Sequence, residues 1–154
     1  MPAPALRLVL DTNVVLDLLH FGEPSVQPIR DALESQHARC YASQGTLSEL
    51  GRVLTYPVFQ LDASAQAALL ARYQLWVGEP QAVTANPNLP RCSDPDDQIF
   101  LELAASIQAD FLGSKDKAVL ALRRRVPGFK IGTPHEVAAF LALSQEGSIR
   151  LASS

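Results

Sequence analysis

The 154-residue sequence has few of the residues that build disulfide frameworks or zinc sites. Its two cysteines, Cys40 and Cys92, and its three histidines, His20, His37 and His135, are scattered along the chain without metal-ligand spacing. Nothing in the sequence points to an oxidising compartment, so the cysteines are predicted to be small buried or semi-buried thiols rather than a disulfide. A zinc site is not expected.

Long apolar runs and an excess of positive charge are also missing. No run approaches the ~20 apolar residues of a membrane helix, and residues 1–6 lack the charged start and the length of a signal peptide. We therefore expect a cytoplasmic protein with no membrane association. The net charge of −3 argues against non-specific coating of nucleic acid, which needs Lys and Arg to neutralise phosphates. It leaves room for a nuclease, because divalent cations would offset an acidic pocket.

The chain length and the pattern of apolar residues predict one domain with an α/β fold. Short apolar segments at 6–10, 39–43 and 129–131, and another just before Ser114, have the character of buried strands and alternate with helical patterns. Such alternation is typical of a parallel sheet between helix layers. We predict a three-layer α/β/α sandwich with a short parallel sheet of four to five strands, occupying residues 1–143.

The expected helices and loops fill the remainder of the chain. Residues 144–154 are expected to form a flexible C-terminal tail, and the loop at 78–90 is expected to contain one short extended piece at 81–83. The basic segment Arg123–Arg125 fits a solvated helix end better than an RNA contact. Helices are predicted at 14–19, 26–35, 46–54, 62–77, 117–124 and 133–143, with a further helix starting at Asp94.

Polar side chains follow three of the predicted strands at the point where each strand ends. Asp11 follows the first strand, Ser43 the second, and Ser114 with Asp116 the strand before them. The carboxyl ends of parallel strands form the edge at which ligands bind in α/β proteins. The sequence therefore predicts a functional site at this edge.

Two further carboxylates lie near the start of predicted helices. Glu49 falls about one turn into its helix, and Asp97 is in the first turn of the helix that Asp94 caps and Pro95 enters. By itself, Asp94 to Asp97 fits a well-capped helix with acidic residues that favour solubility. The other carboxylates decide between that reading and a site.

Four carboxylates at one edge of a sheet would repel one another unless a cation were bound. Magnesium or manganese suits such an all-oxygen site. The chemistry that needs this arrangement is phosphodiester hydrolysis, in which one or two ions about 4 Å apart hold the phosphate and lower the pKa of the attacking water. No Ser-His-Asp set is evident, and neither cysteine has an adjacent base.

Four segments in order resemble the motifs of PIN-domain ribonucleases, of the VapC-like kind that act as toxins in bacterial type II toxin–antitoxin pairs. The resemblance spans residues 8 to 134, and the segments that carry it are Leu10–Val14, Ser48–Leu50, Asp94–Ala104 and Ala109–Asp116. It implies that Asp11, Glu49, Asp97 and Asp116 hold Mg²⁺ or Mn²⁺, supported by Asn13 and Ser114.

The resemblance also places the neighbours of the four ligands. Asp94 is expected to be a helix cap first and an outer neighbour of the metal second, while Asp96 is expected to face solvent. Two residues depart from the family pattern. Lys115 replaces a frequent glycine. Ala118 stands where many members have a second aspartate, so the chain lacks an acid that would help to hold a second metal ion.

The resulting prediction is a divalent-metal-dependent endoribonuclease, the toxin of a toxin–antitoxin pair, with an antitoxin as partner. A homodimer is suggested by the resemblance, and Tyr73 and Trp76 on the 62–77 helix are candidates for its apolar surface.

The alternatives are a nuclease acting on DNA and a catalytically latent PIN-fold interaction module. An aspartyl phosphotransferase of the haloacid-dehalogenase type is disfavoured because Asn13 stands where that chemistry needs a second acid. A receiver domain is disfavoured by the order of its acidic residues.

Overall fold

The computed structural model describes residues 4–153, except for the side chains of residue 21 and of residues 146–153. Its sheet has four parallel strands in the order β2-β1-β3-β4. The strands are β1 (Leu6–Leu10), β2 (Ala38–Cys40), β3 (Phe111–Gly113) and β4 (Lys130–Gly132). The predicted parallel sheet of four to five strands is confirmed.

Helices connect the strands and cover both faces of the sheet. The α-helices are α1 (Thr12–Leu16), α2 (Gln27–Glu34), α3 (Gln44–Leu54), α4 (Ala63–Val77), α5 (Gln98–Ser106), α6 (Lys117–Leu120) and α7 (Pro134–Ser153). A π-helical turn, η1 (Asp17–Phe21), continues α1, and three 3-10 turns are η2 (Pro24–Val26), η3 (Pro57–Phe59) and η4 (Pro95–Asp97).

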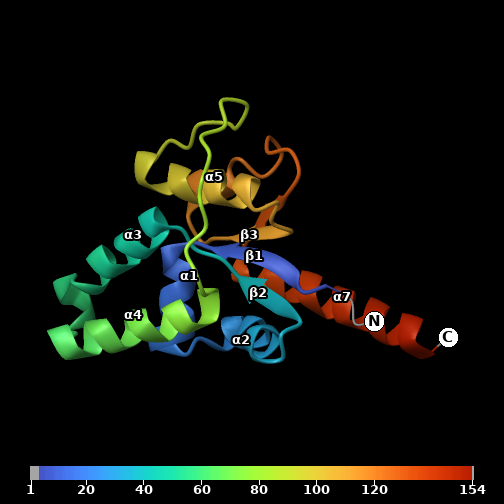
Figure 1. Ribbon diagram of the computed structural model, residues 1–154, viewed down its shortest axis with the longest axis horizontal. Helices are drawn as coiled ribbons and strands as arrows, with labels where there is room; N and C mark the ends of the chain where they lie inside the picture. The colour runs from blue at the N-terminus through green and yellow to red at the C-terminus, as the bar shows by residue number, and fades with distance from the viewer. Residues whose placement is uncertain (1–3, 154) are drawn as a thin grey trace.

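The two faces of the sheet contribute to two separate apolar clusters. Leu8 and Phe111 pack with residues of α1, α2, α4 and α7 on one face, whereas Val9 and Leu112 pack with residues of α5 and α6 on the other. This is the alternation expected of strands buried on both sides. Figure 1 shows α5 on one side of β1 and β3, with α1, α2 and α7 on the opposite side. The predicted three-layer α/β/α sandwich is confirmed.

Two glycines allow α7 to lie close to the sheet. A Cβ atom at Gly132 would lie 2.9 Å from Cε1 of Phe111 and 3.1 Å from Cβ of Glu136. A Cβ atom at Gly113 would lie 3.1 Å from Cδ2 of Leu10 and 3.2 Å from Cγ2 of Val137. Larger residues here would push the helix off the sheet, so these positions favour glycine for packing.

Several boundaries differ from the predicted ones. Strand β2 ends at Cys40 rather than at residue 43, and residues 81–83 form no strand, although the amide of Gln81 donates to the carbonyl of Ala42 at 2.8 Å. Helix α6 ends at Leu120, before the predicted residue 124. Helix α7 continues from the predicted end at residue 143 as far as Ser153, so most of the expected tail is helical, and residue 154 lies outside the described residues.

Burial settles the expectations for the cysteines and for one aromatic residue. Cys40 and Cys92 are both free and buried, as predicted. Tyr73, considered for an exposed apolar surface, is buried instead, with Oη 3.2 Å from Sγ of Cys40. Across the described part of the chain, no helix combines the length and the apolar character needed to cross a membrane.

Candidate metal centre

Asp11 begins the site at the carboxyl end of β1 and is held by hydrogen bonds to both carboxylate oxygens. It is 3% exposed and caps α1, with Oδ1 accepting from the amide of Thr12 at 2.7 Å. Its Oδ2 accepts from Oγ of Ser114 at 2.6 Å, and the same Ser114 oxygen accepts from the amide of Asp116 at 3.0 Å. Ser114 therefore ties the end of β1 to the loop that follows β3.

A second set of contacts fixes the loop after β3 to α1. The amide of Lys115 donates to Oδ1 of Asn13 at 3.2 Å, and Nδ2 of Asn13 lies 3.5 Å from Oδ2 of Asp11. The Lys115 ammonium forms an ion pair of 2.6 Å with Oδ2 of Asp17, which is buried. No local pattern in the sequence marks Asp17, because its partner Lys115 lies far along the chain.

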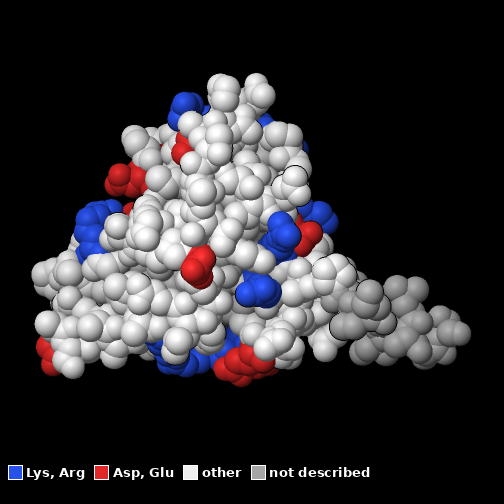
Figure 2. Space-filling view, viewed as in Figure 1, with Lys and Arg blue, Asp and Glu red and all other residues white. Residues whose placement is uncertain are grey.

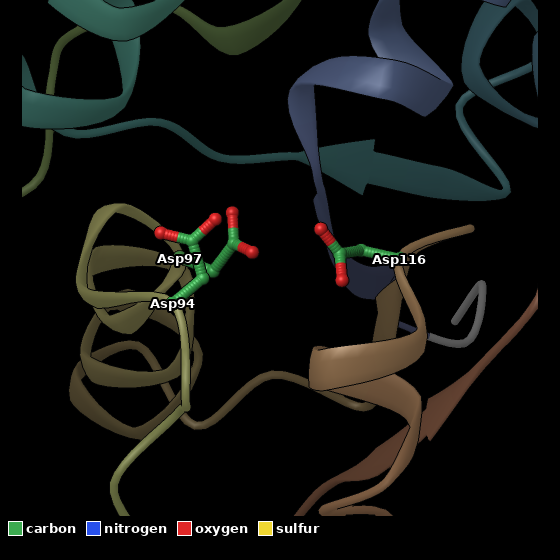
Figure 3. A group of neighbouring side chains, drawn as sticks. All are labelled: Asp94, Asp97 and Asp116. Atoms are coloured by element: carbon green, nitrogen blue, oxygen red, sulfur yellow. The ribbon is translucent and has the colours of Figure 1, made fainter.

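Three carboxylates converge in the site from two different parts of the chain. Asp94, Asp97 and Asp116 each offer an oxygen, and these oxygens lie within 4.8 Å of one another. Figure 3 shows Asp94 and Asp97 side by side, with Asp116 facing them from the other side of the gap. Asp94 also accepts from the amide of Asp96 at 3.0 Å at the start of η4, so its predicted capping role is confirmed. Asp116 caps α6 by accepting from the amide of Ala118 at 2.8 Å.

Glu49 approaches the site from α3, and only one of its two carboxylate oxygens accepts a hydrogen bond among the described residues. Its side chain is 13% exposed, and Oε1 accepts from Nη2 of Arg52 at 3.0 Å. Its Oε2 is buried and has no hydrogen-bond partner among the described residues, and the same holds for Oδ2 of Asp97, a residue 7% exposed. Buried carboxylate oxygens without donors are costly, and a hard divalent cation would satisfy them. The donor set therefore fits magnesium or manganese.

Burial and mutual repulsion make the metal-free carboxylates hard to ionise. The pKa of Asp97 is raised to about 8. Burial is the largest cause, followed by the negative charge of Asp11 and by the interaction with the Asp116 carboxylate. Burial is also the main reason that the pKa of Glu49 is raised, with the charge of Asp11 adding to it. The pKa of Asp11 is raised by burial, while its hydrogen bonds from Ser114 and Thr12 act in the opposite direction.

The structure brings the predicted residues to one edge of the sheet, with different degrees of closeness. Asp97 and Asp116 belong to the tight group, which Asp94 completes. The charge of Asp11 acts on Asp97 and on Glu49. Asp94 is therefore closer to the centre than expected of a helix cap alone. Asp96 is exposed, as predicted. The individual ligand roles stay predictions.

These features define an α/β/α protein with an all-carboxylate site at the ends of parallel strands. The sequence model of the PIN domain family matches residues 7–118, most of the chain and all of the acidic segments. The chain belongs to the PIN domain family, whose members are generally metal-dependent nucleases that act on nucleic acids. A comparison with individual curated proteins gave no match.

Proposed function

We propose that this PIN domain is a divalent-metal-dependent endoribonuclease. The observation that carries the proposal is the pair of buried carboxylate oxygens without donors, on Glu49 and Asp97, beside the group formed by Asp94, Asp97 and Asp116. A structural acidic cluster would be expected to satisfy its oxygens with protein donors, as Asp11 does. Unsatisfied oxygens at this position suit a cation-binding role.

In this proposal Asp11, Glu49, Asp97 and Asp116 hold Mg²⁺ or Mn²⁺. When bound, such an ion supplies a water of lowered pKa and offsets the charge of the scissile phosphate. Ser114 and Asn13 keep the Asp11 carboxylate oriented, and Ser114 also positions the Asp116 backbone. Asp94 caps η4 and sets the entry of Asp97 into the site.

The resemblance to toxin-type PIN domains supports RNA as substrate and the role of a toxin in the cytoplasm. It also supports an antitoxin partner, for which an arginine reaching the carboxylates is a chemically suitable contact. A homodimer stays part of the proposal. Since Tyr73 is buried, an interface on α4 would use other side chains, and Leu75 is the large apolar residue that α4 exposes.

The test is cleavage of a mixed single-stranded RNA pool in EDTA, Mg²⁺ or Mn²⁺ by the parent protein and by Asp97→Asn. Asp31→Asn, an exposed acid on α2, is the control for the loss of one charge. We expect metal-dependent cutting by the parent and the control, and none by Asp97→Asn. If Asp97→Asn cuts RNA at the parent rate, the assignment of Asp97 to the metal site is wrong. If the parent cuts a matched DNA pool and not RNA, the substrate is DNA.

A further inference from the structure

Arg52 places a positive charge at the open rim of the acidic centre. It lies one turn after Glu49 on α3, with Nη2 3.0 Å from Oε1 of Glu49 and 3.9 Å from Oδ2 of Asp96. Its side chain is 52% exposed. A guanidinium has five donors, so the observed contacts leave donors for a further anion. Arg52 is thus both next to the carboxylates and accessible from solvent.

Tyr56 lies beside Arg52, just beyond the end of α3. Nη1 of Arg52 donates to Oη of Tyr56 at 2.7 Å, and Cζ of Arg52 is 5.9 Å from the centre of the Tyr56 ring. Tyr56 is 40% exposed, and the neighbouring Val58 is also exposed. The pair therefore presents a cation and an aromatic ring on the same rim.

A nuclease with an acidic centre needs cations for the phosphates on either side of the one being cut. Lys115 is also near the centre, but its ammonium is paired with the buried carboxylate of Asp17. The Arg52–Asp96 contact is long and exposed, and such surface pairs contribute little, so a phosphate can compete for Arg52. On the face drawn in Figure 2, basic side chains lie in small separate groups rather than in a continuous basic surface. Individual contacts such as Arg52 therefore matter more than overall charge.

We infer that Arg52 and Tyr56 form a binding site for an unpaired nucleotide next to the scissile phosphate. The inference rests on the proposed nuclease function. Arg52 binds a backbone phosphate, for which the guanidinium fork is suited. Tyr56 stacks on a base, which is the common mode for single-stranded nucleic acid. Bases in a duplex already stack on one another, so this contact selects a single-stranded segment of RNA.

The competing explanation is that Arg52 only offsets the charge of Glu49. In that case Arg52→Gln would tighten or leave unchanged the binding of Mn²⁺ and would leave RNA affinity as it is. If Arg52 contacts a phosphate, Arg52→Gln instead weakens the binding of RNA. RNA affinity falls, and its dependence on salt becomes less steep by about 0.7 in the log–log slope, the loss of one phosphate contact to a single strand.

The experiment measures the Kd of a fluorescein-labelled single-stranded RNA in Mg²⁺ at several salt concentrations, using Asp97→Asn as the background so that the probe stays intact. Adding Arg52→Gln is expected to weaken binding about tenfold at low salt, and adding Arg52→Lys is expected to weaken it less. Tyr56→Ala is expected to weaken binding of the single strand about tenfold, whereas Tyr56→Phe keeps the ring and stays near the background value. Melting curves check that each variant is folded.

Arg123→Gln is the matched control, since Arg123 is similarly exposed and pairs with a glutamate, Glu136, at 3.2 Å. Equal losses for Arg52→Gln and Arg123→Gln would show a general charge effect and overturn the assignment. A Tyr56→Ala effect as large on duplex RNA as on a single strand would overturn the selection of unpaired nucleotides. Cleavage by the parent protein is scored separately. Arg52-dependent binding of RNA without cleavage would reject the proposed nuclease and keep the binding site. Cleavage by the parent together with unchanged RNA binding in the Arg52 and Tyr56 variants would keep the nuclease and reject the binding site.

Discussion

The two sides of the acidic centre differ in how the protein treats its carboxylates. On the Asp11 side, both carboxylate oxygens accept hydrogen bonds, from Thr12 and from Ser114. On the opposite side, Glu49 and Asp97 each keep one buried oxygen without a partner among the described residues. The difference indicates that the fold completes the first side by itself and leaves the second to be completed by a bound cation.

The origin of the two sides in the chain explains this difference. The Asp11 side is built by neighbouring strands, since Leu10 of β1 is in register with Gly113 of β3, and Asp11 and Ser114 follow them. Their separation is thus fixed by the sheet. The other side is assembled from α3, which carries Glu49, and from the start of α5, where Asp97 lies; the two helices are in contact. Helix packing rather than strand pairing therefore sets the places of Glu49 and Asp97.

The largest expected effect comes from removing the negative charge of Glu49, on the side of the centre that has buried oxygens without partners. Glu49→Gln is expected to slow RNA cleavage at least about 100-fold, or about 2.7 kcal/mol at 1.36 kcal/mol per factor of ten. Stability of the metal-free protein should not fall, because an uncharged amide relieves repulsion with Asp11. Initial cleavage rates and urea unfolding measure the two quantities. Ser48→Ala, at the exposed neighbouring position, is the control. A Glu49→Gln variant that cuts at the parent rate would remove Glu49 from the site.

The next effect tests the ion pair between Lys115 and Asp17, which fixes the loop after β3 on the Asp11 side of the centre. Lys115→Gln is expected to lower the free energy of unfolding by about 2–3 kcal/mol, because it leaves the buried Asp17 carboxylate without its ion pair. Asp17→Asn should cost less, since no buried charge remains. Urea unfolding of both variants at neutral pH gives the comparison. Equal and negligible losses would mean that the pair contributes nothing to the loop.

Ser114→Ala is expected to cost about 1–2 kcal/mol, because it removes the donor to Oδ2 of Asp11 and the acceptor of the Asp116 amide. Ser114→Thr, which keeps the hydroxyl but adds a methyl group at a fully buried position, separates the hydrogen bonds from packing. Recovery of metal affinity by Ser114→Thr, at whatever cost in stability, would support the hydrogen-bonding role. A Ser114→Ala variant that keeps both the stability and the metal affinity of the parent would contradict it.

The smallest effect is a pH dependence of the metal-free protein. The folded pKa of Asp97, about 8, lies above its value in an unfolded chain, so the folded state binds the extra proton between about pH 4 and pH 8. Stability is therefore fully present below pH 4 for this group and is lost as the pH rises toward 8. Even one unit of the difference in pKa, about 1.4 kcal/mol, corresponds to about 3–6 °C in Tm. Melting temperatures in EDTA should fall less steeply with pH for Asp97→Asn than for the parent, and identical profiles would contradict the assignment.

The sequence predicts the sheet and the acidic edge because both depend on local patterns. The run Leu6–Leu10 is mostly apolar and stops at a cap residue, and the strand has the predicted bounds. Helix α3 begins at a Ser43 capping box, close to its expected start. Strand β2 is shorter than predicted because it lies at the sheet edge, where beyond Cys40 only single backbone bonds continue the pairing, such as that from Tyr41 to Leu8.

Long-range contacts are the part that local patterns leave open. Asp17, the first residue of the π-helical turn, is buried and forms an ion pair with Lys115, which follows another strand. The pattern at Asp94 predicts a cap, and the cap is present, but its place beside Asp116 follows from how α5 packs on the sheet. Helix α7 passes the expected end because no glycine or proline stops it at residue 143.

The most direct test of the account is calorimetric titration of Mn²⁺ into the parent protein, Asp97→Asn and Asp96→Asn. Asp96 is adjacent in sequence and exposed, so it controls for the loss of one negative charge in the same loop. We expect saturable binding to the parent and to Asp96→Asn, and at least tenfold weaker binding to Asp97→Asn. Equal weakening in the two variants, or undiminished binding to Asp97→Asn, would contradict a cation site completed by the buried Asp97 oxygen.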